Sequence, residues 1–243
     1  MTDLTGVVTG AGSGLGRAAA EHLLALGARV ACWDRNGDTL AWTEADPGAL
    51  STTVDVTDPG QVSAAAADLR RRWGRADFVV NSAGVFLVGP LAEVDPVAVR
   101  RLFDVNVVGT TLVTQALLPD LIATRGAVVN LSSTVALRAS RSNAHYAASK
   151  AAIAQLTRCW ALELAGHGVR VNAVAPGPTG TGIYAAAGMP QSQVDELLTA
   201  RAREIPLGRI GDPAEIARWI GRLLADDWVT GHVIPVDGGL SIA

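Results

Sequence analysis

Tyr146 and Lys150 stand four positions apart in a segment with helical apolar spacing. On a helix this spacing places both side chains on one face, with Cβ atoms about 5 to 6 Å apart. Lys150 is the only lysine beside nineteen arginines, and an ammonium, unlike a guanidinium, changes its pKa readily. A nearby cation stabilises a phenolate and lowers the pKa of a phenol. The pair predicts a tyrosine that exchanges a proton with an alcohol; the alternative is an ordinary amphipathic helix.

Polar residues just before this helix could act on the same substrate. Ser133 ends the preceding apolar run, so its hydroxyl could donate to the oxygen that the tyrosine protonates. A serine after a strand also serves as a simple cap or turn residue. Arg138 and Arg141 lie between Ser133 and Tyr146, where solvated arginines are the ordinary expectation and binding of a substrate carboxylate is the alternative.

A glycine-rich turn lies near the N-terminus, directly after an apolar run and before a helical one. Residues 9–16 read TGAGSGLG. Glycines let a chain turn sharply, and amides at a helix N-terminus can approach a pyrophosphate there, favoured by the helix dipole. The turn predicts dinucleotide binding, and the alternative is plain helix packing. The residues expected to bind the cofactor are Gly10, Ser13, Gly14, Leu15 and Gly16.

The second apolar run ends in Asp34, about 20 residues beyond the glycine turn, where an adenosine ribose would lie. A carboxylate there accepts hydrogen bonds from both ribose hydroxyls of NAD, but it repels a 2′-phosphate by about 4 kcal/mol at 4 Å and an effective dielectric of 20. NAD(H) is therefore favoured over NADP(H). Arg35 follows and could turn towards a 2′-phosphate, and Asp34 could simply initiate a turn.

These residues must be positioned by alternating strands and helices. Short β-branched runs predict strands at residues 7–9, 30–33, 51–56, 78–81, 128–131, 169–174 and 233–236. Alanine and leucine at helical spacing predict helices at 14–26, 61–73, 97–118, 146–164 and 213–224. This order predicts an α/β fold: a single-domain, Rossmann-type, doubly wound parallel sheet of about seven strands with helices on both faces, spanning residues 1–243. The Gly- and Pro-rich segment at about 177–206 predicts a substrate flap.

Composition excludes several classes of protein. The chain has 243 residues, 49% of them apolar, and a net charge of −3. These values fit one globular domain rather than a disordered chain or a fibre. The scattered charges predict no nucleic-acid or membrane partner, and no apolar run reaches bilayer length. The four histidines and two cysteines are not spaced for a metal site. Cys32 and Cys159 suggest core thiols, and with no signal peptide we expect a cytoplasmic protein.

Together the motifs resemble those of the short-chain dehydrogenase/reductase family along nearly the whole chain. The glycine turn matches the family's TGxxxGxG pattern, and Ser133 with Tyr146 and Lys150 matches its serine and YxxxK motif. Residues 81–84 resemble its NNAG motif, with Ser82 in place of an asparagine, and Asn106 resembles its helix asparagine. Residues 176–181 and 236–239 resemble its two C-terminal motifs.

The resemblance implies roles for these residues. Tyr146 would be the general acid/base, Ser133 would position the substrate oxygen, Lys150 would bind the nicotinamide ribose and lower the pKa of the tyrosine, and Asn106 would hold a water. Further cofactor contacts are implied at Asp55, Val56, Asn81, Ala83, Gly84, Pro176, Gly177, Thr179 and Thr181. Pairing of the helices at 97–118 and 146–164 would form a homotetramer.

The expected function is NAD(H)-dependent interconversion of a secondary alcohol and a ketone. The segment at 206–211 is similar to 3-oxoacyl-carrier-protein reductases, which commonly use NADPH, and Asp34 disagrees with that alternative. Dihydrodiol and 2,3-dihydro-2,3-dihydroxybenzoate dehydrogenases are a further alternative. A protein that senses NAD without chemistry is the non-enzymatic one, and the Tyr-Lys pair disfavours it.

Overall fold

A single parallel sheet of seven strands forms the centre of the protein, for which a computed structural model describes residues 2–243. Its strand order is β3-β2-β1-β4-β5-β6-β7, and every neighbouring pair is parallel. The strands are β1 (Thr5–Thr9), β2 (Arg29–Asp34), β3 (Ala49–Thr53), β4 (Phe78–Asn81), β5 (Ala127–Leu131), β6 (Arg170–Pro176) and β7 (Val233–Val236). The predicted fold class is thereby confirmed.

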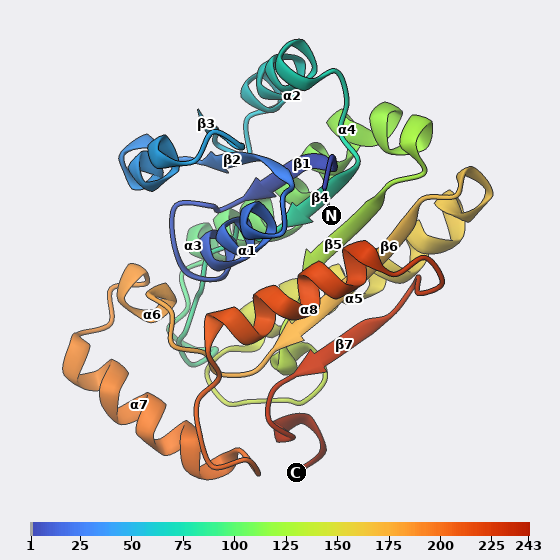
Figure 1. The fold of residues 1–243 in the computed structure, drawn as a ribbon. Coiled ribbons are helices and arrows are strands. Elements are labelled where there is room, and N and C mark those ends of the chain that lie inside the picture. The colour runs from blue at the N-terminus through green and yellow to red at the C-terminus, as the bar shows by residue number, and fades with distance from the viewer. Residues whose placement is uncertain (1) are drawn as a thin grey trace.

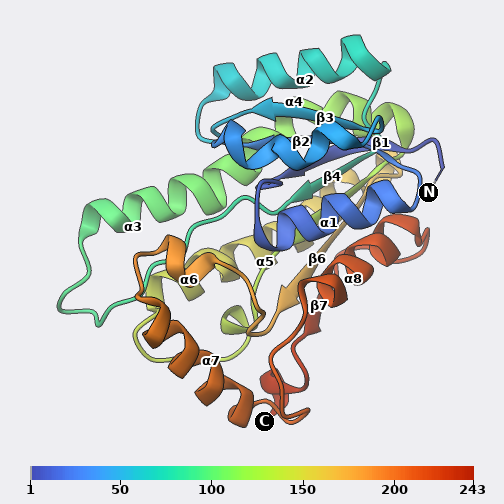
Figure 2. The same cartoon turned by 60° about the vertical axis from the view of Figure 1, so that its left-hand side comes forward.

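Helices cover both faces of this sheet (Figures 1 and 2). One layer contains α1 (Gly14–Ala25) and α8 (Pro213–Ala225), which pack against each other. The opposite layer contains α2 (Pro59–Trp73), α4 (Thr110–Thr124) and α5 (Ala144–Leu164). Apolar strand residues therefore face a helix layer on either side, as in Val8 towards α1 and Val7 towards α2 and α4. Burial on both faces explains why the strand sequences are continuously apolar.

The predicted helix at 97–118 is one helical run in three parts. It consists of α3 (Pro96–Phe103), a π-helical segment (Asp104–Gly109) and α4. Proline follows the capping Asp95 at the start, and Arg125 in the left-handed conformation (φ 52°) ends it. Single π turns widen a helix and redirect one side chain, often at functional sites. Here the buried Asn106 occupies that turn.

The segment predicted as a flap contains two helices, α6 (Ile183–Ala186) and α7 (Gln191–Glu204). Both stand beyond the carboxyl ends of the strands, apart from the two main layers (Figures 1 and 2). The base of the segment is fixed where Thr179 pairs with Gly211, and Gly211 N–H donates to the Pro178 carbonyl at 3.0 Å. The flap is thus tied to the domain at its base, while α6 and α7 make few contacts with the core.

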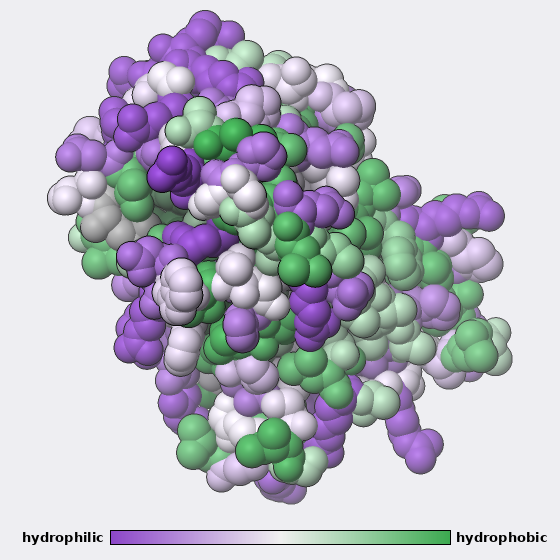
Figure 3. Space-filling view, turned by 90° about the vertical axis from the view of Figure 1, so that its right-hand side faces the viewer, coloured by the Kyte–Doolittle hydropathy of each residue, from purple (hydrophilic) through white to green (hydrophobic). Residues whose placement is uncertain are grey.

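The helical run Pro96–Thr124 is long and apolar enough to cross a membrane by length and composition alone. Its residues Val113, Leu117 and Leu121, however, are fully buried against the sheet, so this run packs as part of the helix layer on one face of the sheet. The surface in Figure 3 mixes hydrophilic and hydrophobic residues in small patches. Cys32 lies in the core as predicted, where burial raises the pKa of its thiol to about 12, but Cys159 is only partly buried.

Candidate active site

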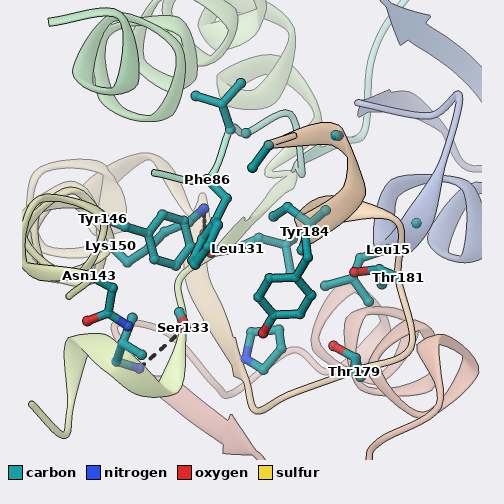
Figure 4. Close-up of a pocket in the computed structure, with 18 of the residues that line it drawn as sticks. Leu15, Phe86, Leu131, Ser133, Asn143, Tyr146, Lys150, Thr179, Thr181 and Tyr184 are labelled. Carbon is teal, nitrogen blue, oxygen red and sulfur yellow. Dashed lines mark hydrogen bonds between the residues drawn. The ribbon is translucent and has the colours of Figure 1, made fainter. Parts of the chain in front are cut away.

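A large cavity opens at the carboxyl ends of the central strands and has a volume of about 720 Å³. The glycine turn after β1, the segment after β4, the start of the α5 region and the flap all contribute to its wall. Carboxyl ends of neighbouring parallel strands are the usual ligand site of doubly wound sheets. Figure 4 shows the part of the cavity where Ser133, Tyr146 and Lys150 meet the flap residue Tyr184.

Most residues predicted from sequence line this one cavity. They are Gly10, Ser13, Gly14, Leu15, Gly16, Asp34, Arg35, Asp55, Val56, Ala83, Gly84, Ser133, Tyr146, Lys150, Pro176, Gly177, Thr179 and Thr181. Asn81 and Asn106 do not line it. The chain therefore brings together residues separated by more than 160 positions, as the sequence analysis required.

The glycine turn leaves donors free at the N-terminus of α1. Gly10 adopts φ +67°, and a Cβ at that position would lie 2.9 Å from the Cα of Ala83. The Ser13 side chain makes no capping hydrogen bond, and the first turn of α1 has no acidic residue. Unpaired amides at a helix N-terminus bind anions. The turn consequently fits the pyrophosphate of a dinucleotide, because no side chain caps the first amides of α1, although the Gly12 amide within the turn donates to Asp34.

Two carboxylates lie at the end of the cavity nearest β2 and β3. Asp34 accepts from Gly12 N–H with one oxygen and from Asn36 N–H with the other, both at 3.0 Å. Asp55 accepts from the hydroxyl of Thr57 at 2.7 Å. That hydrogen bond and the backbone bond from Thr57, assisted by two arginine charges, lower the pKa of Asp55. Both side chains are held in fixed positions where an adenosine would lie.

Two elements position Tyr146 and Lys150. Helix α5 carries Tyr146 and Lys150 on one face, and β5 supplies the carbonyl of Leu131, which accepts from Lys150 Nζ at 2.8 Å. Lys150 Nζ lies 5.8 Å from the centroid of the Tyr146 ring. The Ser132 hydroxyl donates to the Lys150 carbonyl at 2.9 Å and so ties α5 to the end of β5. Ser133, the next residue, then faces the cavity beside Tyr146 (Figure 4).

Burial, rather than the neighbouring Lys150 ammonium, determines the direction in which the pKa of the Tyr146 phenol shifts. Burial raises the pKa of Tyr146, Tyr184 raises it further, and the hydrogen bond with Ser133 lowers it in part. This direction is opposite to the lowering expected from Lys150. The reason is geometric: the ammonium donates to Leu131 and is not among the groups that shift the phenol. Burial also lowers the pKa of Lys150 to about 8, so this lysine can release a proton near neutral pH.

Asn81 was expected to line the cofactor site, and the structure places its side chain in the core instead. Its amide donates to Thr114 at 3.0 Å and to Asn130 at 2.9 Å, and Asn130 in turn donates to Thr157 at 3.0 Å. Strands β4 and β5 and helices α4 and α5 are joined by this network. A buried amide must satisfy its donors, which explains its inward direction.

Asn106 lies behind the cavity wall. Its side chain exchanges hydrogen bonds with the backbone of Val85, accepting at 2.8 Å and donating at 3.1 Å, and donates to Ser149 at 3.1 Å. A Cβ added at Gly84 would lie 3.3 Å from the Asn106 oxygen and 3.5 Å from Lys150 Nζ. Asn106 thus fixes the segment after β4 against α5, close to Lys150.

Three further residues that line the cavity were not predicted as site residues from the sequence. The Phe86 ring contacts the Tyr146 ring edge-on, with centroids 4.8 Å apart, and it contacts the Tyr184 ring at 5.2 Å (Figure 4). Arg201 of α7 also lines the cavity. The flap's own sequence signals only turns and a polar helix, and nothing in it indicates which side chains point inward.

The chain is similar to known proteins along nearly its whole length. The family model described as enoyl-(acyl carrier protein) reductase matches residues 10–241. The chain is 37% identical to 3-oxoacyl-[acyl-carrier-protein] reductase of Thermotoga maritima, covering 97% of both chains. It is 38% identical to cis-4-hydroxycyclohexanecarboxylate dehydrogenase of Sinomonas cyclohexanicum, covering 96% of this chain and 94% of that protein. The crystal structure of levodione reductase superposes with a TM-score of 0.92 at 32% identity, over 100% and 99% of the two chains.

Proposed function

The chain belongs to the short-chain dehydrogenase/reductase family of oxidoreductases that act on CH–OH groups, and from this premise we propose that it interconverts a secondary alcohol and a ketone with NAD(H). One observation carries the proposal. Ser133, Tyr146 and Lys150 meet in a cavity whose other half is an uncapped helix N-terminus with two fixed carboxylates beyond it. Proton transfer and dinucleotide binding therefore share one space.

The chain's own residues account for the proton side of the reaction. A nicotinamide cofactor, held by the glycine turn and by Asp34, would supply the hydride chemistry of the reduction. Burial keeps Tyr146 protonated at neutral pH, so its hydroxyl can give the proton to the carbonyl oxygen, and the Ser133 hydroxyl can donate a hydrogen bond to that oxygen. The phenolate left behind regains a proton, which the buried Lys150, with its Nζ 5.8 Å from the centroid of the ring, can supply. The oxidation of an alcohol reverses each transfer.

Asp34 supports NAD(H) over NADP(H). Its carboxylate is held at the end of β2 by two backbone amides, so it cannot easily turn away from a 2′-phosphate. The second candidate function is NADPH-dependent reduction of a 3-oxoacyl group, which the similarity to the Thermotoga maritima protein favours. Arg35 and Arg101 also line this end of the cavity and would assist a phosphate.

We further propose a cytoplasmic homotetramer. Apolar side chains are exposed on the helices of the layer that contains α4 and α5: Val108 of the π-helical segment before α4 is 46% accessible and Leu162 of α5 is 82% accessible. Exposed apolar groups on neighbouring helices are typical of subunit interfaces. Light scattering should give four times the chain mass, and a monomer at micromolar concentration would contradict the proposal.

Initial rates test the function directly. The purified chain is assayed with NADH and NADPH against cyclic, linear and acyl-thioester ketones, and with the oxidised cofactors against the matching alcohols. Turnover of ketones with NADH preferred is expected. A preference above tenfold for NADPH with an acyl thioester would establish the second candidate. Absence of turnover with every pair would refute both.

A further inference from the structure

Arginines line the cavity at the end formed by the loop before α5 and by α7 of the flap. Arg138 and Arg141 come from the loop before α5, and Arg201 comes from α7 of the flap. Glu204 is the acidic residue that shares this end with them. The surrounding wall is apolar and includes Phe86, Val88, Met189, Leu197 and Leu240. Three arginines and one glutamate therefore line the same cavity as Tyr146, together with a group of apolar side chains.

Arg201 is held in place by groups on both sides of the cavity. Its Nη1 pairs with Glu204 at 2.8 Å, and its Nη2 donates to the Ser140 hydroxyl at 3.3 Å. The second contact connects the flap helix to the loop that follows Ser133. The side chain of Arg201 is 30% exposed, so most of it is removed from water. A partly desolvated, oriented guanidinium binds an anion more strongly than a solvated one.

Aromatic rings connect the reacting groups to the flap that carries Arg201. Tyr184 of the flap lines the cavity together with Arg201; burial raises the pKa of Tyr184, and the positive charge of Arg201 lowers it in part. Tyr184 packs on Phe86, and Phe86 packs on Tyr146. In Figure 4 the Tyr184 ring lies between the Tyr146 side of the cavity and the flap. A small substrate at the Tyr146 hydroxyl would thus extend along these rings towards Arg201.

Arg138 adds donors on the same side. Its Nη1 donates to the Leu240 carbonyl at 3.1 Å, which fixes the guanidinium near the C-terminus. Among the ion pairs formed by residues 2–243, none includes Arg138 or Arg141. A guanidinium carries five N–H donors, so most of those on Arg138 remain free. The cavity end has more positive charge than its own carboxylate neutralises.

We infer that the substrate of this enzyme carries a carboxylate or a similar oxyanion remote from its reacting carbon, and that Arg201, assisted by Arg138, binds it. The inference rests on the proposed function and specifies its substrate class. The fork of a guanidinium matches two carboxylate oxygens, and the apolar wall accepts the carbon skeleton between the two ends. Glu204 competes for Arg201 when the substrate is absent.

A matched pair of ketones tests the inference: 4-oxocyclohexanecarboxylate and its primary amide, which have nearly the same shape. The measured quantity is the ratio of their kcat/KM values with NADH. We expect the wild type to favour the carboxylate at least tenfold, because hydrogen bonds between charged groups are about twice as strong as neutral ones. Arg201→Gln should reduce the ratio at least tenfold, mainly through KM of the carboxylate, and Arg138→Gln should reduce it less.

Two further variants separate binding from damage to the flap. Glu204→Gln removes the carboxylate that competes with the substrate for Arg201. The ratio of kcat/KM for the carboxylate to kcat/KM for the amide should therefore rise above the wild-type value. Arg203→Gln is the matched control, because Arg203 is exposed on the same helix and does not line the cavity; its ratio should match the wild type. As an equilibrium readout, cyclohexanecarboxylate should inhibit reduction of the amide at least tenfold more strongly than cyclohexanecarboxamide does.

The outcomes distinguish the two proposals. A wild-type ratio near one, with both ketones reduced, overturns the anion site and leaves the proposed function intact. A ratio unchanged in Arg201→Gln overturns the assignment of Arg201. Failure to reduce any ketone refutes the proposed function itself. If Arg201→Gln does not fold, the wild-type ratio and the Glu204→Gln variant still decide the question.

Discussion

Replacing Asp34 with asparagine removes one negative charge from the end of β2 while keeping an oxygen acceptor. Asparagine retains a carbonyl oxygen for one of the two amide contacts, from Gly12 or Asn36, so the turn should survive. The repulsion between a carboxylate and a 2′-phosphate at 4 Å is about 4 kcal/mol at an effective dielectric of 20 and about 1 kcal/mol in water. Asp34 is half-buried, and an intermediate value of about 2 kcal/mol corresponds to roughly 30-fold in affinity.

We therefore expect Asp34→Asn to shift the ratio of NADPH to NADH dissociation constants by about 30-fold towards NADPH. Both constants can be measured by quenching of tryptophan fluorescence, since Trp33 lines the cavity. Asp38→Asn is the control, because Asp38 is an exposed carboxylate in the following turn and is not part of the cavity lining. The reasoning is refuted if the wild type binds NADPH more tightly than NADH, or if Asp34→Asn changes the ratio less than threefold.

Three further predictions concern stability. A Cβ at Gly16 would lie 2.6 Å from the carbonyl carbon of Gly10, so Gly16→Ala should lower the free energy of unfolding, measured in urea, by about 1–3 kcal/mol. The control Gly166→Ala places its Cβ in open space and should change that free energy little. Equal stabilities of the two variants would contradict this prediction. Asn130→Leu should cost about 1–3 kcal/mol, because it leaves buried partners unpaired, and unchanged stability would show that the network is dispensable. The native pKa of Lys150, about 8, is below its ordinary 10.5, so the unfolded chain binds more protons between these values. The free energy of unfolding of the wild type, minus that of Lys150→Met, should accordingly rise between pH 8 and 9.5 by about 1.4 kcal/mol per pH unit at most. If this difference does not change with pH, the low pKa of Lys150 is contradicted.

The sequence was sufficient for the fold class because its signals are local. Apolar runs bounded by turns located all seven strands, and the glycine turn located the N-terminus of α1. Bounds differed where capping decides them: Asp58 caps α2 and Pro59 begins it, two residues before the apolar pattern. The π-helical turn at Asn106 could not be predicted, since it depends on contacts with Val85 and Ser149 from other elements.

The candidate site was predictable where residue types are chemically rare and not where tertiary packing selects them. One lysine four residues after a tyrosine was informative in a chain rich in arginine. Arg201 had no such signal, because nineteen arginines look alike in sequence and only the packing of α7 turns this one inward. For Asn81 the motif predicted a cofactor contact, and the structure shows that its side chain completes a buried network.

The most direct test of the account is the Tyr146→Phe variant, which removes one hydroxyl from an otherwise unchanged cavity wall. Its kcat for ketone reduction should fall by about 10²- to 10⁴-fold, the usual contribution of a positioned general acid. The NADH dissociation constant, measured by fluorescence titration on the same preparation, should stay within threefold of the wild type. Ketone reduction at the wild-type rate by this variant, with NADH bound normally, would contradict proton transfer by Tyr146.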